Sequence, residues 1–271
     1  MKLTSDDVLS FEKCGYMVLD GVMPKELSEQ LKETVNAIES KSVHISASVN
    51  YFKDLLFSPW IHDICSLIFQ ARSYSLHHLH AACHREGMPS LGWHHDYESL
   101  NKQDRSFPMI HIFFYLNGMR NEIGELLVVP GSHLQGHGRY EFAGEPFDRF
   151  PGVKSISRLR SGSIVVVHSA LLHARRSLPG GASHPRYFID ASFCDHRGSW
   201  IPYLEGGDWK KILSELALYD RRNSGGEFQF LFNKRCFSPR IRDTVLDGLH
   251  LRSALNSLRA KFSPSKVKVG R

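Results

Sequence analysis

The chain contains few cysteines and no long apolar run. Its five cysteines, at positions 14, 65, 83, 194 and 236, are odd in number and scattered, and no two of them form a CxxC pair. This pattern argues against a disulfide framework or a zinc ribbon and favours a reducing, cytoplasmic setting. No stretch approaches the roughly 20 apolar residues of a membrane span, and the opening segment MKLTSDDVLSFEKCG is too polar and acidic for a signal peptide. We therefore expect a cytoplasmic protein with no membrane partner.

Neither sign of charge is strongly in excess. The 34 basic and 28 acidic residues give a formal net charge of +6 and a pI of about 9.1, which fits an anionic small molecule as a partner. Part of the excess lies in a short basic tail, and such tails are usually solvated; it contains Lys261, Lys266, Lys268 and Arg271. We expect no nucleic-acid partner, and either a monomer or a homodimer.

Helical spacing of apolar residues marks both ends of the chain. Residues 1–72 predict three helices and the short strand Tyr16 to Leu19. Thr4 or Ser5 caps the first helix and Gly15 ends it, and the other two begin near Pro24 and Pro59. Residues 196–271 predict two more helices, with apolar faces made of Trp209, Ile212, Leu213 and Leu216 and of Ile241, Val245, Leu246, Leu249, Leu255 and Leu258.

Short strands fill the middle of the chain, where β-branched and aromatic residues alternate with turn residues. They are expected at 73–84, 108–116, 125–129, 153–159, 163–168 and 187–194. Many short strands of this kind are typical of an antiparallel sandwich or barrel. The prediction is a mainly β fold with flanking helices, in one domain over 1–271: a helical support at 1–72, a β core at 73–195 and a helical extension at 196–271.

The segment WHHD contains a candidate metal-binding pair. In a strand, residues two apart point to the same face, so His94 and Asp96 can bind one ion while His95 points away. One imidazole and one carboxylate are two-thirds of the facial triad that binds iron(II) and leaves positions open for cosubstrate and oxygen. Sixteen histidines in the chain make any single one uninformative.

The third ligand is expected to be a histidine from a later strand. His168 and His173 are both candidates, since Leu171, Leu172 and His173 are expected to continue the strand at 163–168 past a bend. His173 is preferred because Arg186 follows on the next strand. A guanidinium there suits a dicarboxylate cosubstrate, since its planar fork donates two hydrogen bonds to a carboxylate.

Four motifs in order resemble the phytanoyl-CoA dioxygenase family of 2-oxoglutarate-dependent oxygenases. The opening helix with the strand after Gly15 is similar to the family's start, and WHHD matches its WHxD. The run FFYLNGMRNEIGELLVVPGSH, residues 113–133, resembles its strand, acidic loop and turn. The segment HSALLHARRSLPGGASHPR, residues 168–186, matches its H-x4-H followed by Arg.

The resemblance implies a double-stranded β-helix, a cupin-like jelly roll, with iron at its mouth. It implies His94, Asp96 and His173 as iron ligands and Arg186 as the anchor of 2-oxoglutarate. The family's small hydroxyl residue two positions after the last ligand is replaced by Arg175, so Ser177 is the alternative hydroxyl partner. His80 is a further candidate contact to the cosubstrate, and Trp93 is a packing residue or a wall of the cosubstrate pocket.

The implied activity is a dioxygenase that uses Fe(II), 2-oxoglutarate and O2 to oxidise an unactivated C–H bond of a small molecule in natural-product or lipid metabolism, releasing succinate and CO2. A carboxylate at Asp96 favours hydroxylation, or desaturation, epoxidation or ring closure, over halogenation. Loops are expected to carry specificity. The candidate substrate contacts are Tyr97, Arg139, Tyr140 and Phe142.

Two other classes stay open at this point. A non-catalytic, cupin-like binding protein would keep the barrel, but it has no need of both the triad and Arg186. A zinc hydrolase could use the same three ligands with a water, although Arg186 would have no role and no general base is evident from the spacing.

Overall fold

The computed structural model describes residues 3–40, 51–70, 74–100, 105–120, 124–178, 184–203 and 207–238. Residues 239–271 separate as a second unit and lie outside the described residues, as does the helix predicted over residues 241–258. Among the described residues, no helix combines the length and apolar character needed to cross a bilayer.

The first helix begins and ends where the sequence predicts. In α1 (Ser5–Cys14), the Thr4 side chain accepts a hydrogen bond from the Asp7 backbone while the Asp7 carboxylate accepts one from Thr4, a capping box. Gly15 ends the helix at φ 80° and donates to the carbonyl of Phe11. A β-carbon at Gly15 would lie 2.5 Å from Nδ1 of His133, so both conformation and space require glycine there.

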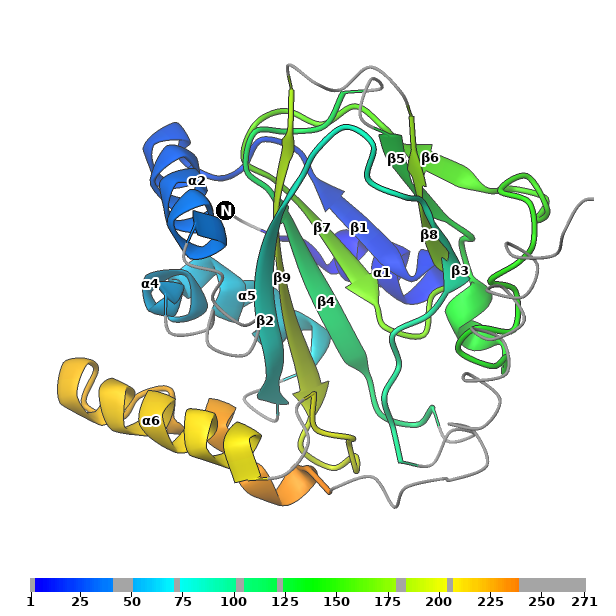
Figure 1. The fold of residues 1–271 in the computed structure, drawn as a ribbon. Helices are drawn as coiled ribbons and strands as arrows, with labels where there is room; N and C mark the ends of the chain where they lie inside the picture. Colours follow the sequence, from blue (N-terminus) through cyan, green and yellow to red (C-terminus); the bar gives the residue numbers. More distant parts are fainter. Residues whose placement is uncertain are drawn as a thin grey trace, which may run out of the picture. The chain divides into compact units, whose positions relative to one another are not determined.

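Nine strands in two antiparallel sheets form the described core (Figure 1). The five-stranded sheet has the order β1-β7-β4-β9-β2 and the four-stranded sheet the order β3-β8-β5-β6. This arrangement confirms the predicted jelly roll. The strands are β1 (Tyr16–Leu19), β2 (Tyr74–His84), β3 (Leu91–His94), β4 (Met109–Tyr115), β5 (Gly124–Val128), β6 (Lys154–Ile156), β7 (Ser163–His168), β8 (His173–Ser177) and β9 (Arg186–Asp195).

Alternation along the strands divides the core into layers. On β4, Ile110, Ile112 and Phe114 join the cluster beneath the helices, while Phe113 and Tyr115 face the other sheet. The helices lie on the outer side of the five-stranded sheet (Figure 1). They are α2 (Lys25–Ser40), α4 (Lys53–Leu56), α5 (Pro59–Ile68) and α6 (Gly207–Asn223). The described chain also contains the short 3-10 turns η3 (Ser132–Leu134), η4 (Gln229–Phe232) and η5 (Lys234–Cys236).

The segment 163–177 corrects one prediction. Leu171 to His173 do not continue the strand at 163–168: β7 ends at His168, the chain turns, and β8 begins at His173 in the opposite sheet. The turn is closed by a hydrogen bond from the Leu171 backbone to the carbonyl of His168. His168 therefore stacks on Tyr97 and lies near Phe11, beside the helical cluster, and only His173 faces the space between the sheets.

Candidate active site

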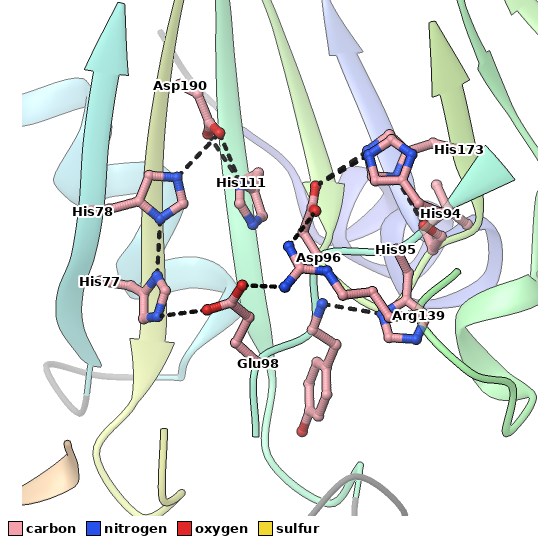
Figure 2. A network of polar contacts seen from close by, with 12 residues as sticks. His77, His78, His94, His95, Asp96, Glu98, His111, Arg139, His173 and Asp190 are labelled. Carbon is pink, nitrogen blue, oxygen red and sulfur yellow. Dashed lines mark hydrogen bonds and ion pairs between the residues drawn. The ribbon is translucent and has the colours of Figure 1, made fainter. Parts of the chain in front are cut away.

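Strand pairing brings His94 and His173 together. They are direct partners in the β3–β8 ladder, and their ring centroids lie 4.2 Å apart. Nε2 of His173 is 3.2 Å and Nε2 of His94 is 3.8 Å from the same oxygen, Oδ2 of Asp96. The three side chains thus converge from two strands and the loop that follows β3 (Figure 2). His94 and His173 are 79 positions apart in the sequence, and the register of the β3–β8 pair makes them neighbours with both imidazoles on the inner face.

Both imidazoles are held so that Nε2 is free to bind a cation. Nδ1 of His94 contacts the carbonyl of Gly92 at 2.8 Å, and Nδ1 of His173 contacts the carbonyl of Leu171 at 2.9 Å. A carbonyl only accepts hydrogen bonds, so each Nδ1 carries a proton, and in this tautomer the Nε2 lone pair is directed toward Asp96. Burial and the neighbouring His173 lower the pKa of His94 to about 4. Two lone pairs and a carboxylate then face one another with no proton between them, the donor set that suits a divalent metal.

Asp96 lies just beyond β3 and is positioned by several contacts. Its backbone donates to the carbonyl of Ser169 at 2.7 Å, and its Oδ1 accepts from Arg139 at 3.2 Å. Arg139 also forms an ion pair with Glu98 (Figure 2). These contacts fix the Asp96 carboxylate against the two imidazoles.

His95 turns away from the other two, as its place in the strand predicts. Its Nε2 lies 3.2 Å from the carbonyl of His137 and 3.3 Å from Arg105, and its Nδ1 accepts from the backbone of Tyr97. These contacts leave it no part in the cavity.

Two arginines, the buried Arg186 and the half-buried Arg175, also line this cavity. Arg186 is 4% exposed, and it reaches Nδ1 of His84 at 3.1 Å, while Arg175 reaches Nε2 of the same ring at 3.2 Å. Burial, then the charges of Arg186 and Arg175, lower the pKa of His84 to about 3. A neutral imidazole has one lone pair, so it cannot accept from both guanidiniums. No carboxylate of the described residues lies within ion-pairing distance of either arginine.

One cavity of about 260 Å³ joins these groups. Its lining combines apolar side chains of both sheets with polar side chains of β2, β4 and β9. The lining consists of His78, His80, His84, Leu91, His94, Asp96, Glu98, His111, Phe113, Tyr115, Leu126, Arg139, His173, Arg175, Arg186, Phe188, Asp190 and Tyr203.

The structure places the remaining predicted site residues in two groups. His80 and Arg139 line the cavity, and Tyr140 lies beside it with its ring 6.3 Å from that of His94. Four others are not among the residues that line this cavity: Trp93, Tyr97, Phe142 and Ser177.

Each of the four has a structural reason. Trp93 is adjacent to His94 on a strand, so it points to the outer face, where it packs with Phe150, and Phe142 stacks edge-on against the same Phe150. The hydroxyl of Tyr97 donates to the carbonyl of Phe107 at 2.5 Å, which directs its side chain away from the cavity. Ser177 pairs with Gly124 at the far end of β8.

Several cavity residues were not identified from the sequence. His84 could have been found, because it continues the alternation of His78 and His80 along β2. Asp190 and His111 carry no local signal, since their meeting depends on the β4–β9 register, and Glu98 and Tyr203 lie in loops. Arg175 was visible only as a departure from a family pattern.

Comparisons with known proteins agree with this fold. A model of the phytanoyl-CoA dioxygenase family (PhyH) matches residues 36–177, more than half of the chain. A comparison with curated proteins gives no match.

Solved structures provide several similar folds. The non-heme α-ketoglutarate-dependent carbocyclase SnoK from nogalamycin biosynthesis is 15% identical, with a TM-score of 0.62 over 78% of this chain and 91% of that chain. HygX from Streptomyces hygroscopicus, with nickel and 2-oxoglutarate bound, is 17% identical, with a TM-score of 0.60 over 77% and 94%. EvdO2 from Micromonospora carbonacea var. aurantiaca, complexed with 2-oxoglutarate, is 17% identical, with a TM-score of 0.59 over 77% and 97%. At these identities the likeness establishes the jelly roll, and the family match establishes the rest: this chain belongs to the phytanoyl-CoA dioxygenase family of iron- and 2-oxoglutarate-dependent enzymes.

Proposed function

We propose that His94, Asp96 and His173 bind one iron(II) ion on one face and leave the opposite positions open to the cavity. The observation that carries this proposal is the convergence of two Nε2 lone pairs on a carboxylate oxygen, at 3.2 and 3.8 Å, with each Nδ1 proton donated to a backbone carbonyl. Metal-binding histidines are usually oriented in this way. Without a cation, three electron-rich atoms would lie in contact in a largely buried place, which is costly.

Arg186 is the proposed anchor for the far carboxylate of 2-oxoglutarate, and Arg175 stands where the family has a small hydroxyl residue. Both guanidiniums lack an acidic partner among the described residues, and both compete for one imidazole. A carboxylate placed between them would accept charge-assisted hydrogen bonds that His84 cannot provide. Arg175 thereby supplies a second cation in place of the missing hydroxyl, and Ser177 has no part in the cosubstrate site.

Bound iron(II), with 2-oxoglutarate and O2, supplies the oxidising power to attack an unactivated C–H bond, with release of succinate and CO2. The chain supplies position and exclusion of water. Two strands and a loop fix the ligand set, Arg139 fixes the free oxygen of Asp96, and Phe113 and Phe188 provide apolar walls. Hydroxylation is the proposed outcome, and the carbocyclase among the similar folds makes ring closure the alternative to test.

The proposed substrate is a small molecule with several polar groups. The wall facing it includes Glu98, Arg139 and Tyr203, together with imidazoles of β2 and β4. A pocket with this many donors and acceptors suits hydroxyl, amine or carboxylate groups more than a long alkyl chain. We further propose a cytoplasmic enzyme with one oxygenase domain, acting as a monomer or a homodimer.

The test is spectroscopic and needs no substrate. The full chain, stripped of metal, is mixed anaerobically with iron(II) and 2-oxoglutarate, and the visible charge-transfer band of the chelate is titrated. We expect the wild type to give this band, His173→Ala to lose it, and Arg186→Ala to require at least about 10-fold more 2-oxoglutarate. Oxygen-dependent succinate should follow the same order.

The matched control is His168→Ala, which removes the other histidine of the same H-x4-H segment. Because its ring lies beside Tyr97 and away from the cavity, it should keep the band, with folding checked by circular dichroism. A band that survives His173→Ala, or one that disappears only in His168→Ala, would overturn the ligand assignment.

A further inference from the structure

A second cluster of two histidines and one aspartate lies in the same cavity. His80 and Asp190 are direct partners in the β2–β9 ladder, and His78 precedes His80 on the same face of β2. Nε2 of His78 is 3.3 Å and Nδ1 of His80 is 3.8 Å from Oδ2 of Asp190. The corresponding distances around Asp96 are 3.2 and 3.8 Å. The two clusters therefore have the same donors at nearly the same spacing.

A β-bulge arranges the histidines of this cluster. The register between β2 and β9 shifts between Leu76 and His78, which leaves His77 as the extra residue. Nδ1 of His77 consequently lies 2.9 Å from Nδ1 of His78, and Nε2 of His77 lies 2.8 Å from the carbonyl of Ile201. The bulge thus turns two consecutive imidazoles toward one another (Figure 2).

This chain of contacts fixes where the protons are. The carbonyl of Ile201 only accepts, so Nε2 of the buried His77 carries its proton. Nδ1 of the neutral His77 must then accept from Nδ1 of His78. A neutral His78 consequently presents the lone pair of Nε2 to Asp190, as His94 and His173 do to Asp96. His77 has the role that a backbone carbonyl has in the first cluster.

The other two members also fit a ligand set. His111 donates from Nδ1 to Asp190, at 2.9 Å from Oδ1, and so orients the carboxylate as outer partners of metal ligands do. Nδ1 of His80 is buried without a hydrogen-bond partner among the described residues. This nitrogen lies 3.8 Å from Oδ2 of Asp190 and is available to a cation that the carboxylate also binds.

We propose that His78, His80 and Asp190 bind a second divalent transition-metal ion, separate from the iron site but in the same cavity. Ligand atoms about 2.0–2.1 Å from a tetrahedral ion lie about 3.3 Å apart, so the observed 3.3 and 3.8 Å need only small side-chain rotations. Imidazole and carboxylate suit zinc, cobalt or iron. Three protein ligands leave one position open, and a substrate hydroxyl or carboxylate oxygen in the cavity is its fourth ligand.

The experiment counts metal ions on the full chain. Protein stripped with a chelator is titrated anaerobically with cobalt(II) alone, followed by its visible absorption, and the cobalt retained after gel filtration is measured by mass spectrometry. We expect two ions per wild-type chain, one in Asp96→Ala, one in His80→Ala and none in the double variant. The spectra of the two single variants should differ, because each reports one cluster.

His84→Ala is the matched control, since His84 lies on the same face of β2 and lines the cavity but belongs to neither cluster; it should retain two ions. His80→Gln, which keeps the volume, repeats the test if His80→Ala fails to fold. One ion on the wild type and on His80→Ala would overturn the proposal: His78 would then be an imidazolium paired with Asp190. One ion on the wild type that Asp96→Ala keeps and His80→Ala loses would instead overturn the iron assignment and leave the second site standing.

Discussion

The two histidine–aspartate clusters differ mainly in what surrounds them. The first joins β3, β8 and a loop, its imidazoles donate to backbone carbonyls, and the outer partner of Asp96 is Arg139. The second lies within the five-stranded sheet, and Asp190 is bonded to His111. Burial opposes protonation of His111, but the Asp190 carboxylate raises its pKa above the usual value.

The contrast suggests that the Asp96 cluster requires a bound cation, whereas the negative charge of Asp190 is partly balanced without a metal. Around Asp96 both imidazoles direct Nδ1 to backbone carbonyls, and the arginine paired with the carboxylate, Arg139, is 30% exposed. Around Asp190 the buried His111 lies 2.9 Å from the carboxylate, which raises its pKa and so favours a buried positive charge there. We therefore expect metal removal to change the first cluster more, and loss of the carboxylate to damage the fold more at the second.

The largest expected effect is on stability, in metal-free protein. Asp190→Asn leaves the His111 charge buried without its partner and should lower the free energy of unfolding by about 3 kcal/mol. Asp96→Asn removes a pair with the half-buried Arg139, so we expect a loss of about 1 kcal/mol or less. Urea unfolding in excess chelator measures both.

Asp148→Asn, at an exposed position, is the control and should stay within about 0.5 kcal/mol of the wild type. Equal losses for Asp190→Asn and Asp96→Asn would remove the distinction between the two clusters.

A second, smaller effect concerns pH, since the ligand imidazoles of both clusters bind a metal only when they are neutral. His84 tests this without belonging to either cluster. Its pKa is about 3 in the folded protein and about 6.5 when unfolded. Its contribution to stability is therefore fully present above pH 6.5 and is lost as the pH falls from 6.5 toward 3.

Between pH 7.5 and 5 this loss is between about 1 and 2 kcal/mol, after allowing for solvent screening. His84→Gln should reduce the pH dependence of the unfolding free energy by that amount. Above pH 7.5 the wild type and the variant should run parallel, which serves as the control. If the unfolding free energies of the wild type and His84→Gln stay parallel down to pH 5, His84 is protonated in the folded cavity.

The two clusters also show how far the sequence can be interpreted. The HxD spacing, the later His173 and Arg186 could be predicted because residue type and strand period carry that information. His78 and His80 could be placed on one face of a strand, but their partner Asp190 lies 110 residues beyond His80 and is identified only by the β2–β9 register. Registers depend on packing of the whole sheet, so no local pattern predicts them.

Two expectations assumed that neighbours in the sequence share a location in space. Tyr97 was expected to contact substrate because it directly follows the metal-binding motif, but its hydroxyl bonds to the carbonyl of Phe107. Leu171 to His173 were joined to the preceding strand because an apolar run does not show where a chain passes from one sheet to the other. The described fold was otherwise predictable, because caps, turns and alternation agree along β1, β2, β4 and β7.

The smallest expected effect tests what Arg139 contributes to the first cluster, as the counterpart of His111 in the second. Two effects oppose one another there. Arg139 orients Asp96 and so strengthens metal binding, but its positive charge repels the metal. Arg139→Lys keeps the charge and loses the planar fork that reaches both Asp96 and Glu98, while Arg139→Met loses both.

If orientation dominates, as we expect, both variants bind cobalt(II) at the first cluster about 10-fold more weakly, the lower end for loss of an outer partner. The affinity is measured in a His80→Ala background, so that only the first cluster is titrated. Arg149→Lys, which alters an exposed ion pair with Glu145, should leave it unchanged. Tighter binding by Arg139→Met with no change in Arg139→Lys would show that charge outweighs orientation, and Asp96 would then be held well enough by its backbone bond to Ser169.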